Sequence, residues 1–180
     1  MNDGLIPNRY AKALYKLALE RDDAKPVYEQ MKTLGTAYAD HPDLKQTVGN
    51  PFLSIDDKTR LLLTAAGTTD ADGSLARFLP LVFKNSRIEF LREMALSYVK
   101  LYREANDIAS VEVVTAAKAD DSTVDHIVDV VKSQLGGKTI ELSRRVDPDL
   151  IGGFTVNVDS MVLDASVKKQ LEKLRLKLLS

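Results

Sequence analysis

Hydrophobic residues recur with the period of an α-helix through roughly the first hundred residues of the chain. Tyr10, Ala13, Leu14 and Leu17 form the first such stripe, and Pro7 stands before it at a position that favours the start of a helix. Further helices are expected at about 25–39, at 43–48, after a cap at Ser54, at 75–83, and from Asn85 or Ser86 to about Asn106. These six helices, joined by short polar loops, predict an antiparallel helical bundle.

The fifth segment is more apolar than one core-facing stripe requires. It carries Leu75, Phe78, Leu79, Leu81, Val82 and Phe83, with Pro80 in its middle, where we expect a kink. Two interpretations stay open at this point. The segment is either a central helix buried on most sides, or one wall of a groove that receives a partner helix.

The period changes after Asn106. Short runs of β-branched or alternating apolar residues predict strands at about 111–114, 140–146, 154–158 and 161–163, with a two-residue turn at Asp159 and Ser160. A helix is expected from about Asp121 to Gly136, and a last one from about Ala165 with its inward positions at Val167, Leu171, Leu174 and Leu178. The predicted fold class is α+β, mainly α: an N-terminal six-helix bundle at 1–106 and a small α/β domain at 107–180.

Composition narrows the function classes. The 180 residues carry a formal charge of -1, which gives no broad attraction for nucleic acid or anionic lipid. There is no cysteine, so disulfides, thiolate metal sites and cysteine nucleophiles are excluded. No run of about 18 apolar residues occurs, so a membrane-spanning helix is not expected.

Candidate catalytic chemistry is sparse. The two histidines, His41 and His126, fall in different predicted domains, and His126 is interpreted as a surface residue. Gly152 and Gly153 are interpreted as turn glycines, because no phosphate-loop spacing surrounds them. The segment 147–149, Asp-Pro-Asp, is interpreted as a turn rather than a carboxylate pair. No catalytic residue, metal site or cofactor is predicted.

Two stretches of the sequence resemble a known family. Residues 9–14 read Arg-Tyr-Ala-Lys-Ala-Leu, and residues 146–154 read Val-Asp-Pro-Asp-Leu-Ile-Gly-Gly-Phe. Val158, then Asp164-Ala165-Ser166-Val167, and then Leu171 and Leu174 follow in the same order and spacing as in the family. Together these motifs are similar to the delta subunit of ATP synthase, whose mitochondrial member is the oligomycin sensitivity-conferring protein, and the resemblance covers essentially the whole chain.

The resemblance implies a non-catalytic stator subunit of the F-type proton-translocating ATP synthase, peripheral on the cytoplasmic face of the inner membrane. The bundle at 1–106 would bind the N-terminal helix of the alpha subunit in the catalytic head, and the domain at 107–180 would bind the b subunits of the peripheral stalk. The family's groove lies between its first and fifth helices. Carried onto this chain, it gives the partner-binding residues Tyr10, Ala13, Leu17, Phe78 and Leu81.

Three other functions remain as alternatives at this stage. The first alternative is a helical adaptor for a different amphipathic partner, and the second is a small enzyme built on His126 and nearby Asp residues. The third is a nucleic-acid binder that uses the basic face of its last helix. The resemblance favours the stator. It also predicts that a charge at Tyr10 or Phe78 weakens attachment to the head while the domain stays folded.

Overall fold

The structure, a computed structural model, describes residues 4–117, 120–159 and 161–179. The chain divides into two compact units, Met1–Glu104 and Ala105–Ser180, called here the helical unit and the α/β unit. The sequence placed the boundary after residue 106. Each unit is described by itself.

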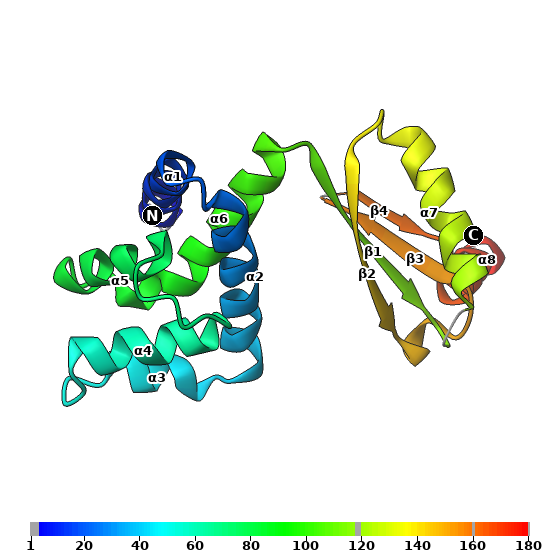
Figure 1. Cartoon of the computed structure of the whole chain (residues 1–180). Helices are drawn as coiled ribbons and strands as arrows, with labels where there is room; N and C mark the ends of the chain where they lie inside the picture. Colours follow the sequence, from blue (N-terminus) through cyan, green and yellow to red (C-terminus); the bar gives the residue numbers. More distant parts are fainter. Residues whose placement is uncertain (1–3, 118–119, 160, 180) are drawn as a thin grey trace. The chain divides into compact units, whose positions relative to one another are not determined.

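The helical unit contains the six expected α-helices (Figure 1). They are α1 (Leu5–Glu20), α2 (Ala24–Asp40), α3 (Asp43–Gly49), α4 (Ile55–Ala65), α5 (Ser74–Lys84) and α6 (Leu91–Ala105). Ser54 caps α4 as predicted, because its Oγ accepts a hydrogen bond from the Asp57 amide at 3.1 Å. Pro80 lies inside α5, which continues as one helix to Lys84.

The start of the sixth helix differs from the prediction. A single 3-10 turn, η1 (Ile88–Phe90), precedes α6, and Ser86 does not cap a helix but has a left-handed backbone with φ of 53°. Ser86 and Arg87 donate backbone hydrogen bonds to Phe83 and Val82, which is the Schellman arrangement that ends a helix. Glycine usually occupies the left-handed position of this motif, whereas here serine does. The sequence therefore lacked the glycine that would have indicated the end of α5.

The core of the helical unit is formed by one apolar stripe from each long helix. Its largest fully buried side chains include Leu14, Met31, Leu34, Leu62, Leu75, Leu79, Leu91, Met94 and Tyr98. The Tyr98 hydroxyl donates to the carbonyl of Ala24 at 3.2 Å, so this polar group is satisfied inside the core. Burial, followed by the nearby charge of Asp23, raises the pKa of Tyr98 above its ordinary value.

The α/β unit has the predicted β-α-β-β-β-α order. Its elements are β1 (Ile108–Thr115), α7 (Asp121–Gln134), β2 (Thr139–Val146), the 3-10 turn η2 (Pro148–Leu150), β3 (Phe154–Val158), β4 (Met161–Asp164) and α8 (Val167–Leu179). The sheet order is β2-β1-β3-β4, with β1 and β2 parallel and the other pairs antiparallel. Val158 pairs with Met161 across the predicted hairpin turn, whose second residue, Ser160, lies outside the described residues.

One face of this sheet packs against α7 (Figure 1). The shared core consists of Val111, Val113, Val156 and Val158 from the strands and Val124, Ile127, Val128 and Val131 from the helix. These valines of β1 and β3 alternate along their strands, so their side chains lie on the face of the sheet that packs against α7.

The Asp-Pro-Asp and double-glycine segment is a turn, as the sequence predicted. The Asp147 carboxylate accepts a hydrogen bond from the Asp149 amide at 3.1 Å. Gly153 has φ of 74°, and a Cβ added there would lie 2.4 Å from the carbonyl oxygen of Ala165. Only glycine fits where these two backbone segments approach so closely.

Helix α8 begins at Val167, slightly later than expected, because Ser166 caps it. The Ser166 Oγ accepts from the Lys169 amide at 3.2 Å, and the Asp164 carboxylate accepts from the Ser166 amide at 3.0 Å. The hydrogen bonds that the Ser166 side chain and backbone amide donate to the Asp164 carboxylate lower the pKa of Asp164. The prediction that Leu171 and Leu174 point inward is wrong: they are 51% and 55% exposed, so α8 leaves these two leucines uncovered within this chain. The side chain of Leu178 lies outside those that the structure describes.

Candidate functional site: a groove between α1 and α5

Helix α1 carries two apolar stripes rather than one. Pro7, Ala11, Leu14 and Ala18 are buried and face the core. Ile6, Tyr10, Ala13 and Leu17 follow a second stripe with spacings of three and four residues, and none of these four is buried. A helix that only covers a core needs the first stripe alone. The second stripe is therefore available for another contact.

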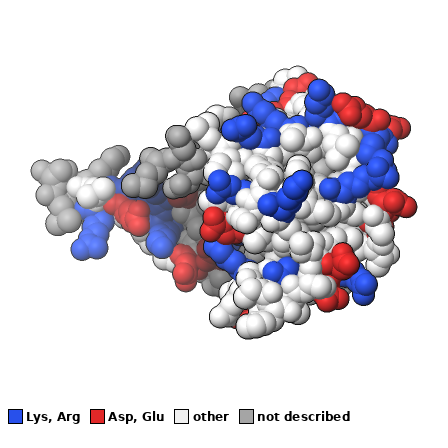
Figure 2. All heavy atoms as spheres, turned by 90° about the vertical axis from the view of Figure 1, so that its left-hand side faces the viewer, with Lys and Arg blue, Asp and Glu red and all other residues white. Residues whose placement is uncertain are grey.

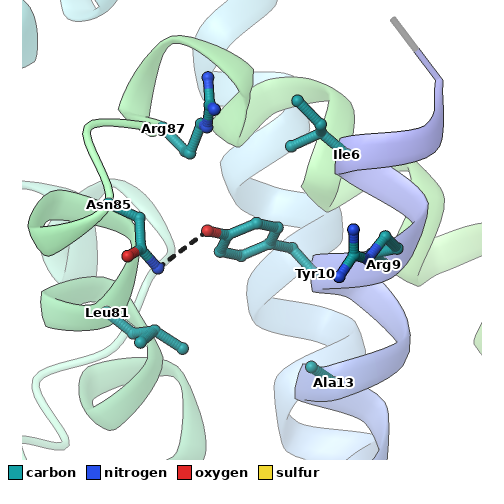
Figure 3. Close-up of a pocket in the computed structure, with 7 residues that line it drawn as sticks. All are labelled: Ile6, Arg9, Tyr10, Ala13, Leu81, Asn85 and Arg87. Atoms are coloured by element: carbon teal, nitrogen blue, oxygen red, sulfur yellow. Dashed lines mark hydrogen bonds between the residues drawn. The ribbon is translucent and has the colours of Figure 1, made fainter. Parts of the chain in front are cut away.

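Helix α5 faces this second stripe and closes a groove with it. The groove has a volume of about 450 Å³ and is lined by Ile6, Arg9, Tyr10, Ala13, Leu81, Asn85 and Arg87 (Figure 3). Leu81 and Asn85 are one helical turn apart on α5 and at its end, and Leu81 is 48% exposed. We call this feature the α1–α5 groove.

Tyr10 joins the two walls of the groove. Its ring meets the edge of Phe78 with centroids 6.1 Å apart and an interplanar angle of 73°. Its hydroxyl accepts a hydrogen bond from Asn85 Nδ2 at 2.9 Å (Figure 3). The half-buried ring is thereby held upright between α1 and α5, where it forms part of the groove floor.

A polar contact ties the α1–α2 turn to the start of α5. The Asp23 carboxylate accepts hydrogen bonds from the Ser74 amide at 2.9 Å and from the Ser74 hydroxyl at 2.8 Å. Arg21 adds a hydrogen bond to the carbonyl of Asp72 at 2.8 Å. Ser74 is fully buried, so Asp23 in the α1–α2 turn satisfies the N-terminus of α5. The groove walls are thus held together through Asp23 as well as through Tyr10.

The structure places the five residues predicted from the sequence in different environments. Tyr10, Ala13 and Leu81 line the groove. Leu17 is half-buried one turn beyond Ala13 and does not line it. Phe78 is only 3% exposed, so it lies in the core beneath Tyr10 and is not on the groove surface. The expectation that a charge at Phe78 leaves the domain folded is therefore not consistent with its burial.

Four lining residues were not predicted. Ile6 and Arg9 share the helical spacing of Tyr10 and Ala13, so the periodicity of α1 contained the signal for them. Asn85 and Arg87 follow the end of α5, and their position depends on the left-handed turn at Ser86. No local sequence pattern predicted that turn.

The α/β unit has an apolar surface of its own. A pocket of about 380 Å³ is lined by Val130, Val131, Leu135, Val156, Val158, Met161, Val162 and Leu163. Within it, Met161 and Val162 are each 68% exposed, and Leu163 is 58% exposed. Three adjacent exposed apolar residues on an edge strand are unusual for a surface that faces only water. We call these three residues the β4 patch.

The two histidines considered for catalysis belong to different units of the chain. His41 belongs to the helical unit and His126 is exposed on α7 of the α/β unit. Among the described residues, no group of three or more His, Cys, Asp or Glu side chains is arranged to hold a metal ion. None of the helices in the described ranges is long and apolar enough to cross a membrane.

Comparisons with known proteins agree over nearly the whole chain. A family model described as ATP synthase delta (OSCP) subunit matches residues 6–178. The ATP synthase subunit delta of Parabacteroides distasonis is 37% identical, covering 99% of this chain and 98% of its own length. That of Phocaeicola vulgatus is 34% identical, covering 96% of this chain and 92% of its own length.

A solved structure shows the same fold. A chain in the cryo-EM structure of the Toxoplasma gondii mitochondrial ATP synthase hexamer superposes with a TM-score of 0.71. It covers 97% of both chains at 22% sequence identity. The arrangement of a helical unit followed by a small α/β unit is therefore shared with a protein of low sequence similarity.

Proposed function

Because the chain belongs to the ATP synthase delta (OSCP) subunit family, we propose that its helical unit binds the catalytic head of the synthase and its α/β unit binds the peripheral stalk. Membership of the family makes the chain a non-catalytic stator subunit of the F-type ATP synthase. Rotation of the central rotor would turn the head with it unless an outer stalk held the head still. The subunit links the two, so that the torque of the rotor drives ATP synthesis.

The exposed apolar stripe of α1, facing Leu81 across the α1–α5 groove, is the observation that carries the head-binding proposal. An amphipathic helix fits such a groove with its apolar face inward. The occupant we propose is the N-terminal helix of the alpha subunit. Burial of the groove and of the helix face stabilises the complex by roughly 25 cal/mol per Å² of apolar surface, before the costs of association.

The β4 patch and α8 support the proposal for the other unit. Met161, Val162 and Leu163 are exposed on an edge strand, and Leu171 and Leu174 are exposed on α8. Surfaces of this kind are covered in an assembly more often than they are left in water. We propose that the b subunits of the peripheral stalk cover them, which places the chain peripherally on the cytoplasmic face of the inner membrane.

Leu81→Asp tests the head contact. The charge lies on the groove surface, where the bound helix would remove it from water without a partner, so we expect binding to weaken by about 30-fold or more. The measurement is calorimetric titration of the full chain with a peptide that copies the N-terminal helix of the same organism's alpha subunit. Co-sedimentation with heads stripped of this subunit provides a second assay.

Leu96→Asp is the matched control for Leu81→Asp. Leu96 lies on α6 and is 50% exposed, close to the 48% of Leu81, but it does not line the groove. We expect the control to bind like the unaltered chain. Equal losses in both variants, or no binding by the folded unaltered chain in either assay, would contradict the proposal.

Val162→Asp tests the stalk contact in the same way. We expect this charge in the β4 patch to weaken binding of a soluble b-subunit fragment by about tenfold or more, because it would be buried without a partner. Val146→Asp, at a 51% exposed position on the other edge strand, serves as the control. Unchanged binding by Val162→Asp, measured by surface plasmon resonance, would exclude the β4 patch from the stalk contact.

A further inference from the structure

The α1–α5 groove is chemically different at its two ends. Figure 3 shows Arg9 and Arg87 with Ile6 and Asn85 toward the end where α1 begins, whereas Ala13 and Leu81 lie toward the other end. Both arginines are exposed. In the part of the chain that the structure describes, neither is within 4.0 Å of a carboxylate in an ion pair. We call Arg9 and Arg87 the rim arginines.

The other polar group at this end is already engaged. Asn85 donates its amide hydrogen to the Tyr10 hydroxyl at 2.9 Å. With five N–H donors each, the rim arginines supply most of the hydrogen-bond donors among the residues that line the groove. Figure 2 shows the side of the molecule on which α1 and α5 lie in Figure 1: its centre is mostly uncharged with several separate Lys and Arg side chains, while Asp and Glu lie mostly toward its edge.

Guanidinium groups in this setting select carboxylates. Arginine presents a planar fork of donors that matches the two oxygens of a carboxylate, and it is less strongly hydrated than lysine. A helix lying over the apolar floor would exclude water from one side of such a pair and reduce its screening by salt. A helix with a basic or uncharged residue at this end would leave both arginines unpaired and partly desolvated.

We propose that the helix bound in the α1–α5 groove carries at least one Asp or Glu that pairs with the rim arginines, and that this contact fixes the direction in which the helix lies. The carboxylate end sits near Ile6, Arg9 and Arg87, and the apolar end fills the space beside Ala13 and Leu81. The proposal rests on the proposed function, because the occupant is the N-terminal helix of the alpha subunit. It adds the partner's charge pattern and its orientation.

Charge reversal tests the pairing. We compare the full chain with Arg9→Glu/Arg87→Glu for binding of the alpha-subunit peptide at low and at high salt. Opposite charges at two positions become like charges, so we expect about tenfold weaker binding at low salt and a smaller difference at high salt. A peptide whose Asp and Glu at the paired positions are changed to Lys should recover binding to the double variant and lose binding to the unaltered chain.

Lys45→Glu is the control for a general effect of charge. It lies on α3, which is distant from α1 within the helical unit (Figure 1), and it is exposed. The rim double variant changes two charges, so Lys45→Glu is combined with Arg60→Glu, at an exposed position on α4. The control and the rim double variant then have the same net charge. We expect this matched pair to bind the peptide with an unchanged salt dependence.

The direction in which the peptide lies in the groove is a second measurement, and it would not change if the arginines only stabilised the fold. The chain contains no cysteine, so a single introduced cysteine carries a spin label at one site. With the label at Asn8→Cys, beside Arg9, we expect the strongest paramagnetic broadening at the acidic end of an isotope-labelled peptide. With the label at Lys16→Cys, farther along α1, we expect it at the other end.

The outcomes separate this proposal from the one on which it rests. Loss of binding in Leu81→Asp together with unchanged binding and salt dependence in Arg9→Glu/Arg87→Glu would overturn the pairing and leave the groove in place. An alpha-subunit helix without Asp or Glu, or a peptide that lies in the opposite direction, would overturn it as well. Failure of the unaltered chain to bind the peptide at any salt concentration would instead overturn the proposed function.

Discussion

Phe78→Asp should unfold the helical unit rather than weaken a surface contact. Phe78 is 3% exposed and packs beneath the Tyr10 ring, with centroids 6.1 Å apart. Truncation of a buried phenylalanine alone costs about 3–5 kcal/mol, and a carboxylate left in its place adds a desolvation cost. Small domains are stable by about 5–15 kcal/mol, so this single change removes a large part of that margin.

Hydrogen exchange on the full chain measures this effect in each unit separately. We expect Phe78→Asp to abolish slow exchange in α1, α5 and the helices packed on them, while the α/β unit retains its protection. Leu81→Asp, three residues later on the same helix, introduces the same charge at an exposed position and should leave exchange unchanged. Retained protection throughout Phe78→Asp would show that Phe78 does not contribute to the core as its burial indicates.

Gly153→Ala should destabilise the α/β unit by about 3 kcal/mol or more, for two separate reasons. The backbone at Gly153 has φ of 74°, and an L-residue in the left-handed region costs about 1–2 kcal/mol. The added Cβ would also lie 2.4 Å from the Ala165 carbonyl oxygen, a backbone atom that cannot move aside by changing a rotamer. The turn between η2 and β3 would have to move away from the segment that precedes α8.

Gly136→Ala isolates the first of these two reasons. Gly136 also has a left-handed backbone, with φ of 62°, but a Cβ there meets nothing within 4 Å. Chemical denaturation followed through the α/β unit should therefore show a loss of about 1–2 kcal/mol for Gly136→Ala and a clearly larger loss for Gly153→Ala. Equal losses would mean that the approach of Gly153 to Ala165 is not close enough to matter.

Most of the fold could be predicted from the spacing of apolar residues and from the residues that cap helices and form turns. The stripes of apolar residues at spacings of three and four predicted the six helices of the helical unit, and short runs of β-branched or alternating apolar residues predicted the strands of the sheet. Local chemistry located several boundaries, such as the cap at Ser54 and the Asp147 turn. These signals are reliable because each depends on hydrogen bonds among residues that are close in sequence.

The candidate groove was predicted less completely, for reasons that are tertiary. Periodicity showed that α5 has too many apolar residues for one face, but it did not separate the buried Phe78 from the exposed Leu81. That distinction depends on how α1 packs against α5. Arg87 reaches the groove only because Ser86 adopts a left-handed conformation that serine seldom takes.

The leucines of α8 illustrate a different limit of sequence reasoning. Amphipathic spacing predicted that Leu171 and Leu174 face the core of this chain, and the structure leaves both about half exposed. An apolar stripe indicates that a helix face is buried in a contact, but it does not indicate whether the contact is with the same chain or with a partner. In a subunit of a larger assembly, this ambiguity is greatest at the surfaces that matter for assembly.

The connection between the two units has a mechanical consequence. Helix α6 ends at Ala105 and β1 begins at Ile108, and the Asp107 carbonyl already accepts a hydrogen bond from the Thr139 amide of β2 at 3.0 Å. Such a short covalent segment is almost inextensible, because stretching it means stretching bonds. Bending it requires only rotation about a few backbone dihedral angles. We therefore expect this connection to deform under load by a change of angle rather than by a change of length.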